Sequence, residues 1–85
     1  MSSRINKEIN QEQMIKIIET LGYAHTATKG SHLLYRHEKS SGIIVMRNAK
    51  KKEILPIGIS MSIFTSIINS GVADQKEIFE IIENL

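Results

Sequence analysis

The chain has 85 residues, enough for one small domain with a modest core, and its formal net charge is +2. It has no cysteine, which excludes disulfides and thiolate metal sites, and no apolar run near the roughly 20 residues that a membrane span needs. No stretch near the start resembles a signal peptide, so we expect a soluble, cytoplasmic protein whose core is mainly aliphatic.

The positive charge is concentrated in the middle of the chain. Residues 29–52 hold seven basic side chains and one acidic side chain, a net charge of +6, whereas residues 53–85 hold one basic and five acidic, a net charge of −4. A local positive field favours a polyanion such as nucleic acid. Lysines on strand edges and in hairpin loops also keep a protein soluble, so charge alone leaves both explanations open.

The first predicted element is a helix over about residues 11–21. Asn10 with Gln13 predicts a capping box at its start, and Gly22 predicts its end. Apolar residues recur in this segment with helical spacing, at Met14, Ile17, Ile18 and Leu21.

We expect residues 1–9 to be an N-terminal extension and residues 10–85 to be a single domain. Ile5 and Ile9 could carry the first helix backwards by two turns.

Three strands are predicted next, over residues 23–29, 32–37 and 43–47, with Gly30-Ser31 and residues 38–42 as the turns between them. Side chains alternate between the two faces of a strand. Leu33 and Tyr35 make the better core face, so His32 and Arg36 should point outward.

Two helices are predicted to end the chain. Pro56 and Gly58 predict an irregular segment over 54–60, followed by a helix from Ser60 or Met61 to Asn69, capped by Ser60 or Ser62. Asp74 with Glu77 predicts a capping box for a last helix over 75–84. The apolar residues expected to face the core are Ile63, Phe64, Ile67, Ile68, Ile78, Ile81, Ile82 and Leu85. The order α-β-β-β-α-α predicts an α+β fold with helices on one face of a three-stranded antiparallel sheet.

The chemical candidate is His32. A histidine exchanges protons near neutral pH, and neighbouring Lys29 and Arg36 could hold phosphate oxygens. His37 lies an odd number of residues away, on the opposite face, so we expect no metal site. No nucleophile or nucleotide-binding motif occurs. From spacing alone, the favoured explanation of His32 is a surface histidine without a chemical role. We expect no chemical role for His25 and His37 either.

The stretch Lys29-Gly30-Ser31-His32-Leu33-Leu34-Tyr35, after a helix that ends Leu21-Gly22-Tyr23, resembles the HicA (YcfA-like) family of toxin mRNA interferases. Ser66–Val72 and Phe79–Ile82 resemble later motifs of the family, so the likeness covers about residues 10–85. The sequence departs from the family where many members carry Pro-x-His after the third strand. It reads Met46-Arg47-Asn48 there, so the role of a second histidine is not carried over. Met61-Ser62-Ile63 stands in place of the usual Gly-Thr-Leu.

The resemblance implies a fold like that of double-stranded-RNA-binding domains and cleavage of mRNA without a metal or other cofactor. It implies one catalytic histidine, which maps onto His32, and a HicB-type antitoxin as partner. The residues that we predict to contact RNA are Lys29, Gly30, Ser31, Arg36 and Arg47. Two alternatives remain at this stage. One is an RNA-binding module in which His32 is a contact only, and the other is a protein-interaction domain.

Overall fold

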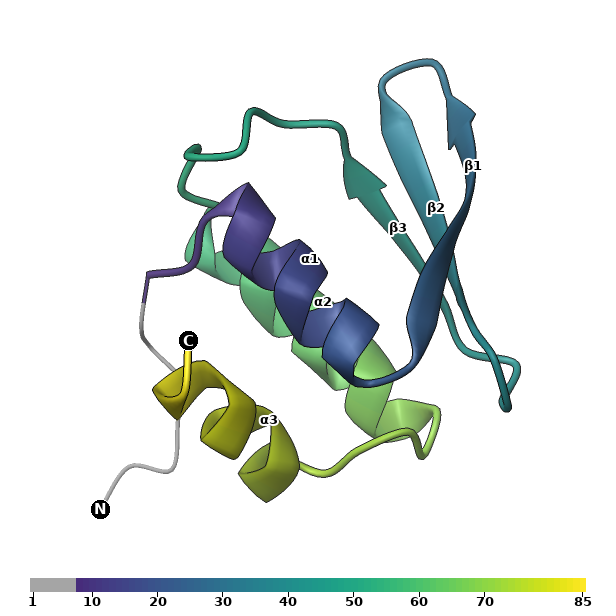
Figure 1. Ribbon diagram of the computed structural model, residues 1–85, viewed down its shortest axis with the longest axis vertical. Coiled ribbons are helices and arrows are strands. Elements are labelled where there is room, and N and C mark those ends of the chain that lie inside the picture. The colour runs from purple at the N-terminus through teal and green to yellow at the C-terminus, as the bar shows by residue number, and fades with distance from the viewer. Residues whose placement is uncertain (1–7) are drawn as a thin grey trace.

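The computed structural model of the protein describes residues 8–85, and its elements follow the predicted order (Figure 1). The helices are α1 (Gln11–Thr20), α2 (Ile57–Asn69) and α3 (Gln75–Glu83). The strands β1 (Tyr23–Lys29), β2 (His32–His37) and β3 (Ile43–Arg47) form one antiparallel sheet in the order β1-β2-β3. The predicted α+β arrangement, similar to a double-stranded-RNA-binding domain, is confirmed.

The helices lie to one side of the sheet (Figure 1). α1 packs against β1, α2 packs against β3, and α3 packs against both of these helices. Between them lies a core of aliphatic side chains with Phe64 and two tyrosines, Tyr23 and Tyr35. The opposite face of the sheet carries the exposed residues of the strands, so a side chain there is open to a large ligand.

The start of α1 shows why Ile9 does not continue the helix. Asn10 caps α1 by accepting from the Gln13 N–H at 2.8 Å, and the Gln13 side chain accepts from the Asn10 N–H at 2.9 Å. Ile9 lies before this cap, is 1% exposed, and its carbonyl accepts from the Leu55 N–H at 2.8 Å. Ile9 is therefore a core residue that precedes the helix, while Ile5 lies outside the described residues.

The predicted start of the second helix was wrong by about one turn. α2 begins at Ile57, and Pro56 is its N-cap, with a carbonyl that accepts from the N–H groups of Ile59 and Ser60 at 2.9 and 3.1 Å. Proline is compatible with a helix start because the first turn needs no N–H donor from it. Ser60 is buried inside the helix, so neither it nor Ser62 is the cap.

The predicted core faces are mostly confirmed. Ile63, Phe64, Ile67, Ile78 and Ile82 are buried, as are Met14, Ile17 and Ile18 of α1 and Leu33 and Tyr35 of β2. Leu21 and Ile81 are partly buried and pack against the core. Ile68 and Leu85 are 39% and 38% exposed, so their assignment to the core was wrong. Ile68 lies about 100° around the helix from the fully buried Ile67, outside the face of α2 that Ser60, Ile63, Phe64 and Ile67 bury.

His37 joins the end of α1 to the β2–β3 loop. Its Nε2 lies 2.9 Å from the Leu21 carbonyl oxygen, and its Nδ1 lies 3.2 and 3.1 Å from the N–H groups of Lys39 and Ser40. Because a carbonyl can only accept, Nε2 carries the proton and Nδ1 accepts from the loop. The ring also meets the Tyr23 ring edge-on, with centroids 5.1 Å apart. His37 is half-buried, and its contacts give it a structural role.

Burial and the Glu19 carboxylate raise the pKa of Tyr35 above its ordinary value of 10.0. The unfolded chain therefore ionises at this tyrosine before the folded protein does, so the contribution of Tyr35 to stability is fully present below pH 10.0 and is lost as pH rises through the folded pKa. We expect Tyr35→Phe to lose less stability than the wild type between about pH 8 and about pH 11. Urea unfolding at the two pH values measures this, and equal losses in both proteins would contradict it.

Candidate active site

The turn between β1 and β2 places His32 at the end of the sheet. Lys29 pairs with His32, so Gly30 and Ser31 form a two-residue hairpin turn. Gly30 has φ +59°, and no other kind of residue among 8–85 has a positive φ. A positive φ at the first of two turn residues is the type II′ geometry, for which glycine is preferred. A Cβ at Gly30 would meet nothing within 4 Å, so the backbone of this turn is open to close approach.

Strand pairing sets three basic side chains in a row. Lys29 of β1 lies opposite His32 of β2, and His32 lies opposite Arg47 of β3. Directly opposite residues share a face of the sheet, with Cβ atoms about 4.5–5.5 Å apart. The sequence predicted this face for His32, and the burial of Leu33 and Tyr35 on the other side confirms it. Among residues 8–85, nothing hydrogen-bonds to the exposed His32 imidazole.

Arg36 lies on the same face but at a distance from this row. It is four residues beyond His32 on β2, roughly 13 Å along the strand at about 3.3 Å per residue. Its neighbours across the sheet are Ala24 and Ile43. One phosphate cannot contact both His32 and Arg36, so Arg36 is separated from the other residues that we predicted at the site.

Arg47 is already paired in the structure. Its guanidinium donates to the Glu53 carboxylate in the loop after β3, and these two side chains are 67% and 38% exposed. Lys29 has no ion pair within the part of the chain that the structure describes. Among the described residues, Lys29 is therefore the cation beside His32 that has no ion pair, while Arg47 can bind another anion most strongly once it leaves Glu53.

A cleft of about 500 Å³ opens beside His32. We call it the His32 cleft. Its polar lining is Gln11, His32, Arg47 and Glu53, and its apolar lining is Val45, Met46, Ala49, Ile54, Leu55, Pro56 and Ile59. The lining comes from the start of β2, the end of β3 and the loop after it, and the starts of α1 and α2. The cleft thus combines an exposed imidazole with an apolar wall.

Sequence reasoning missed Gln11, which lines this cleft. Gln11 is 2% exposed, and its Nε2 donates to the Arg47 carbonyl oxygen at 3.0 Å. Its Oε1 is shielded from solvent and accepts no hydrogen bond from any described residue. An unpaired buried acceptor costs about 1–3 kcal/mol. A polar residue at the first position of a helix is normally exposed, so no sequence signal marked it.

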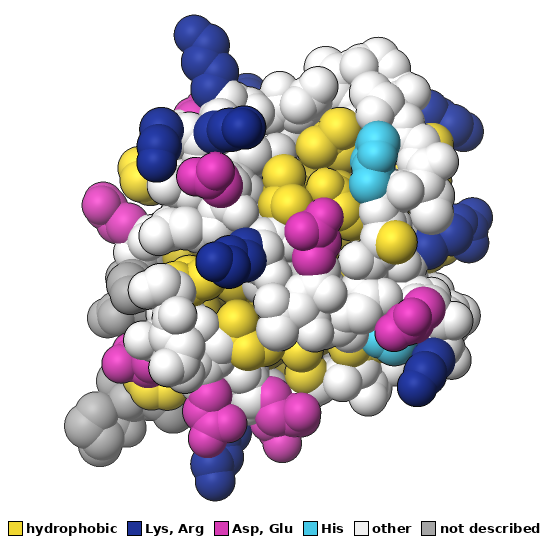
Figure 2. All heavy atoms as spheres, viewed as in Figure 1, with side chains coloured by type: hydrophobic (Ala, Val, Ile, Leu, Met, Phe, Trp, Pro, Cys, Tyr) yellow, Lys and Arg dark blue, Asp and Glu magenta, His cyan; other side chains and the backbone are white. Residues whose placement is uncertain are grey.

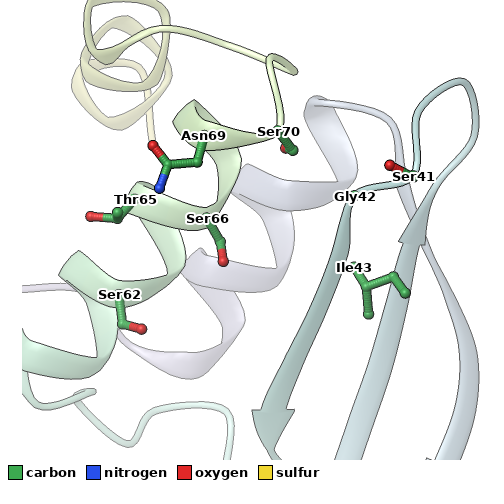
Figure 3. A pocket seen from close by; sticks show the side chains of 8 residues that line it. All are labelled: Ser41, Gly42, Ile43, Ser62, Thr65, Ser66, Asn69 and Ser70. Atoms are coloured by element: carbon green, nitrogen blue, oxygen red, sulfur yellow. The ribbon is translucent and has the colours of Figure 1, made fainter.

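A second hollow, of about 550 Å³, lies between the start of β3 and α2 (Figure 3). Its lining is Ser41, Gly42 and Ile43 on one side, and Ser62, Thr65, Ser66, Asn69 and Ser70 on the other. In Figure 3 hydroxyl and amide groups of α2 stand along this hollow. None of the described residues that line it is charged or a histidine, so it offers hydrogen bonds but no acid–base group.

Basic and acidic side chains are concentrated on different parts of the surface. Figure 2 shows Lys and Arg side chains over the loop after β3 and along the strand side, and Asp and Glu side chains around the α3 end. The His32 cleft therefore lies on the basic part of the surface. Among residues 8–85, no three His, Cys, Asp or Glu side chains are placed to hold a metal ion together. Within the same range, every helix is too short or too polar to cross a membrane.

Comparison with known proteins identifies a family. A family model described as the HicA toxin of bacterial toxin–antitoxin systems matches residues 12–67, which include β1, β2 and β3. Searches of curated proteins and of solved structures found no match. The matched segment holds His32, the row beside it and most of α2. Because it spans more than half of the chain, the protein belongs to the HicA toxin family of bacterial toxin–antitoxin systems.

Proposed function

We propose that the protein is an endoribonuclease that cleaves mRNA in the cytoplasm without a metal ion, with His32 as the catalytic residue. The observation that carries the proposal is the setting of His32. Its imidazole is exposed, makes no hydrogen bond within residues 8–85, and lies between Lys29 and Arg47 at the mouth of a cleft. An imidazole without an internal partner is available to take a proton from a substrate.

The reaction that fits these groups is attack of a ribose on its own phosphodiester. Neutral His32 takes the proton of the 2′-OH, and that oxygen attacks the adjacent phosphorus. The bond to the 5′-oxygen of the next nucleotide breaks, leaving a 2′,3′-cyclic phosphate and a 5′-OH end after that oxygen gains a proton. Lys29, and Arg47 once it leaves Glu53, stabilise the charge that builds on the phosphoryl oxygens. Gly30 and Ser31 let the RNA backbone come close to the turn.

Membership of a toxin–antitoxin family supports a protein partner that restrains this activity. We propose a HicB-type antitoxin that covers His32 and its cleft. Exposed apolar side chains adjoin the cleft, at 58% exposure for Val45, 48% for Ile54 and 49% for Ile59. Exposed apolar groups of this kind suit a protein interface as well as RNA.

The chemical ends of the fragments test the proposed reaction. Purified protein is incubated with a long mRNA, and the fragments are examined before and after treatment with a phosphatase that opens cyclic phosphates. The expected ends are 2′,3′-cyclic phosphate and 5′-OH. Fragments with 3′-OH and 5′-phosphate ends would contradict attack by the 2′-oxygen.

Glu53→Gln is expected to strengthen RNA binding by about two- to fivefold, because it frees Arg47 from an exposed ion pair of modest energy. The measurement is the dissociation constant for RNA in a His32→Ala background, where the RNA stays intact. Glu80→Gln on α3 makes the same change in net charge far from the cleft and should change binding less. Unchanged or weaker binding by Glu53→Gln would contradict a role for Arg47 in holding phosphate.

A further inference from the structure

The amide of Gln11 is fixed in one orientation. Its Nε2 donates to the Arg47 carbonyl oxygen at 3.0 Å, so the two ends of the amide cannot exchange without placing oxygen against oxygen. Oε1 is therefore the end left without a partner in the described part of the chain, in a side chain that is 98% buried. Gln11 lines the His32 cleft, so this acceptor becomes available to a ligand that brings a donor once the side chains that shield it move aside.

The edge of β3 adds main-chain groups beside Gln11. The His37 N–H donates to the Gly42 carbonyl and the Asn48 N–H donates to the Ser31 carbonyl, which fixes the alternation of the β2–β3 ladder. In an antiparallel pair, every second residue points its N–H and C=O away from the partner strand. By this alternation, Val45 points them outward, on the same edge as the Arg47 carbonyl that Gln11 contacts. Val45 also lines the His32 cleft.

The apolar lining of the cleft suits a flat, weakly polar group. Met46 and Leu55 are buried, while Ile54 and Ile59 are about half exposed and lie at its rim. A nucleobase has apolar faces and an edge of donors and acceptors, so it can use the wall and the polar groups together. His32 lines the same cleft, which would place the base next to the ribose that is cut.

We propose that the His32 cleft is a nucleobase subsite in which Gln11 Oε1 accepts a hydrogen bond from the base. This inference rests on the proposed function, because it assigns the cleft to the same RNA. The favoured bases are adenine, cytosine and guanine, whose amino groups can donate to Oε1. Uracil has one ring N–H between two carbonyl oxygens, and these oxygens would face the Gln11 oxygen unfavourably.

The test uses RNA that cannot be cut, so that binding is measured apart from cleavage. Hexanucleotides with 2′-fluoro riboses carry either uracil throughout or one adenine, cytosine or guanine at an internal position. The wild type should bind the amino-bearing hexamers about three- to tenfold more tightly than the uracil hexamer, the range that one neutral hydrogen bond gives. The side-chain amide NMR signal of Gln11 should shift with the amino-bearing hexamers.

Gln11→Met keeps the size of the side chain and removes the acceptor, so it should bind all four hexamers within about twofold. Gln75→Met is the matched control, because Gln75 is the first residue of α3 as Gln11 is of α1. The Gln75→Met variant should keep the preference for the amino-bearing hexamers. Equal binding of all hexamers by the wild type, or a preference that survives Gln11→Met, would overturn the subsite. Cleavage of unmodified RNA by the wild type is assayed in parallel. If the wild type does not cleave but still prefers the amino-bearing hexamers, only the proposed function is refuted.

Discussion

Replacing His32 with alanine is expected to lower the rate of RNA cleavage by at least about 100-fold, the lower end of what a positioned acid–base group contributes. Among the described residues, His32 is the only histidine that lines the His32 cleft, and no carboxylate is hydrogen-bonded to its imidazole. Because the side chain is exposed and makes no hydrogen bond with any residue among 8–85, its loss should leave the fold intact. RNA binding should persist through Lys29 and the other basic groups.

His25→Ala is the matched control for this prediction. His25 is also exposed on the sheet, where its Nε2 lies 2.9 Å from Thr28 Oγ1 and its ring meets that of Tyr35. The rate constants are measured under single-turnover conditions on one short RNA, and circular dichroism checks that each variant is folded. The His25 variant should cleave at a rate close to that of the wild type. Equal loss in both variants would show a structural effect, and a folded, active His32 variant would contradict the assignment.

Gly22→Ala is expected to lower the free energy of unfolding by about 2–4 kcal/mol, from a total of about 4–13 kcal/mol for a chain of this size. Gly22 has φ +99°, where a side chain is strained, and its Cβ would lie 2.9 Å from His37 Nε2. The imidazole would have to move away from the Leu21 carbonyl. The joint between α1 and the β2–β3 loop would then loosen.

Gly71→Ala is the control that measures the cost of backbone strain without a contact to His37. Gly71 also has a positive φ, +77°, but a Cβ there meets nothing within 4 Å. It should cost only the strain, about 1–2 kcal/mol. Urea unfolding of the two variants gives the difference, which is the contribution of the His37 contact. Equal losses would show that the displacement of His37 costs nothing.

The face of β2 could be predicted from the sequence because a strand has a strict two-residue period. Once Leu33 and Tyr35 were assigned to the core, the outward direction of His32 followed, and the structure agrees. The capping boxes at Asn10 and Asp74 were predictable for a similar reason, since each needs only two residues at a fixed spacing. These local rules determine most of the fold.

Contacts between distant segments were not predictable in this way. Ile9 is buried in the core and its carbonyl accepts from the N–H of Leu55, which is 46 residues away, and no local pattern shows this. The start of α2 was misplaced because Pro56 and Gly58 were interpreted only as breakers. Leu85 matched the apolar period of α3, but the period does not tell where the supporting surface ends.

The residues of the candidate site also divide into those that a local pattern predicts and those that only the fold brings together. His32 and its neighbours in the turn are consecutive, so the sequence could identify them. Arg36 was grouped with them by sequence proximity, although the extended strand carries it away. Gln11 and Glu53 come to the cleft from α1 and the loop after β3, through a hydrogen bond and an ion pair with Arg47 that only the folded chain creates.

The most direct test of the central claim is a time course of one long mRNA with the purified, folded protein in excess EDTA. The account predicts that the wild type cuts the RNA into discrete fragments while His32→Ala leaves it intact. RNA that is bound but remains intact with the wild type would contradict a ribonuclease and leave an RNA-binding protein. Cutting by both proteins would contradict catalysis by His32.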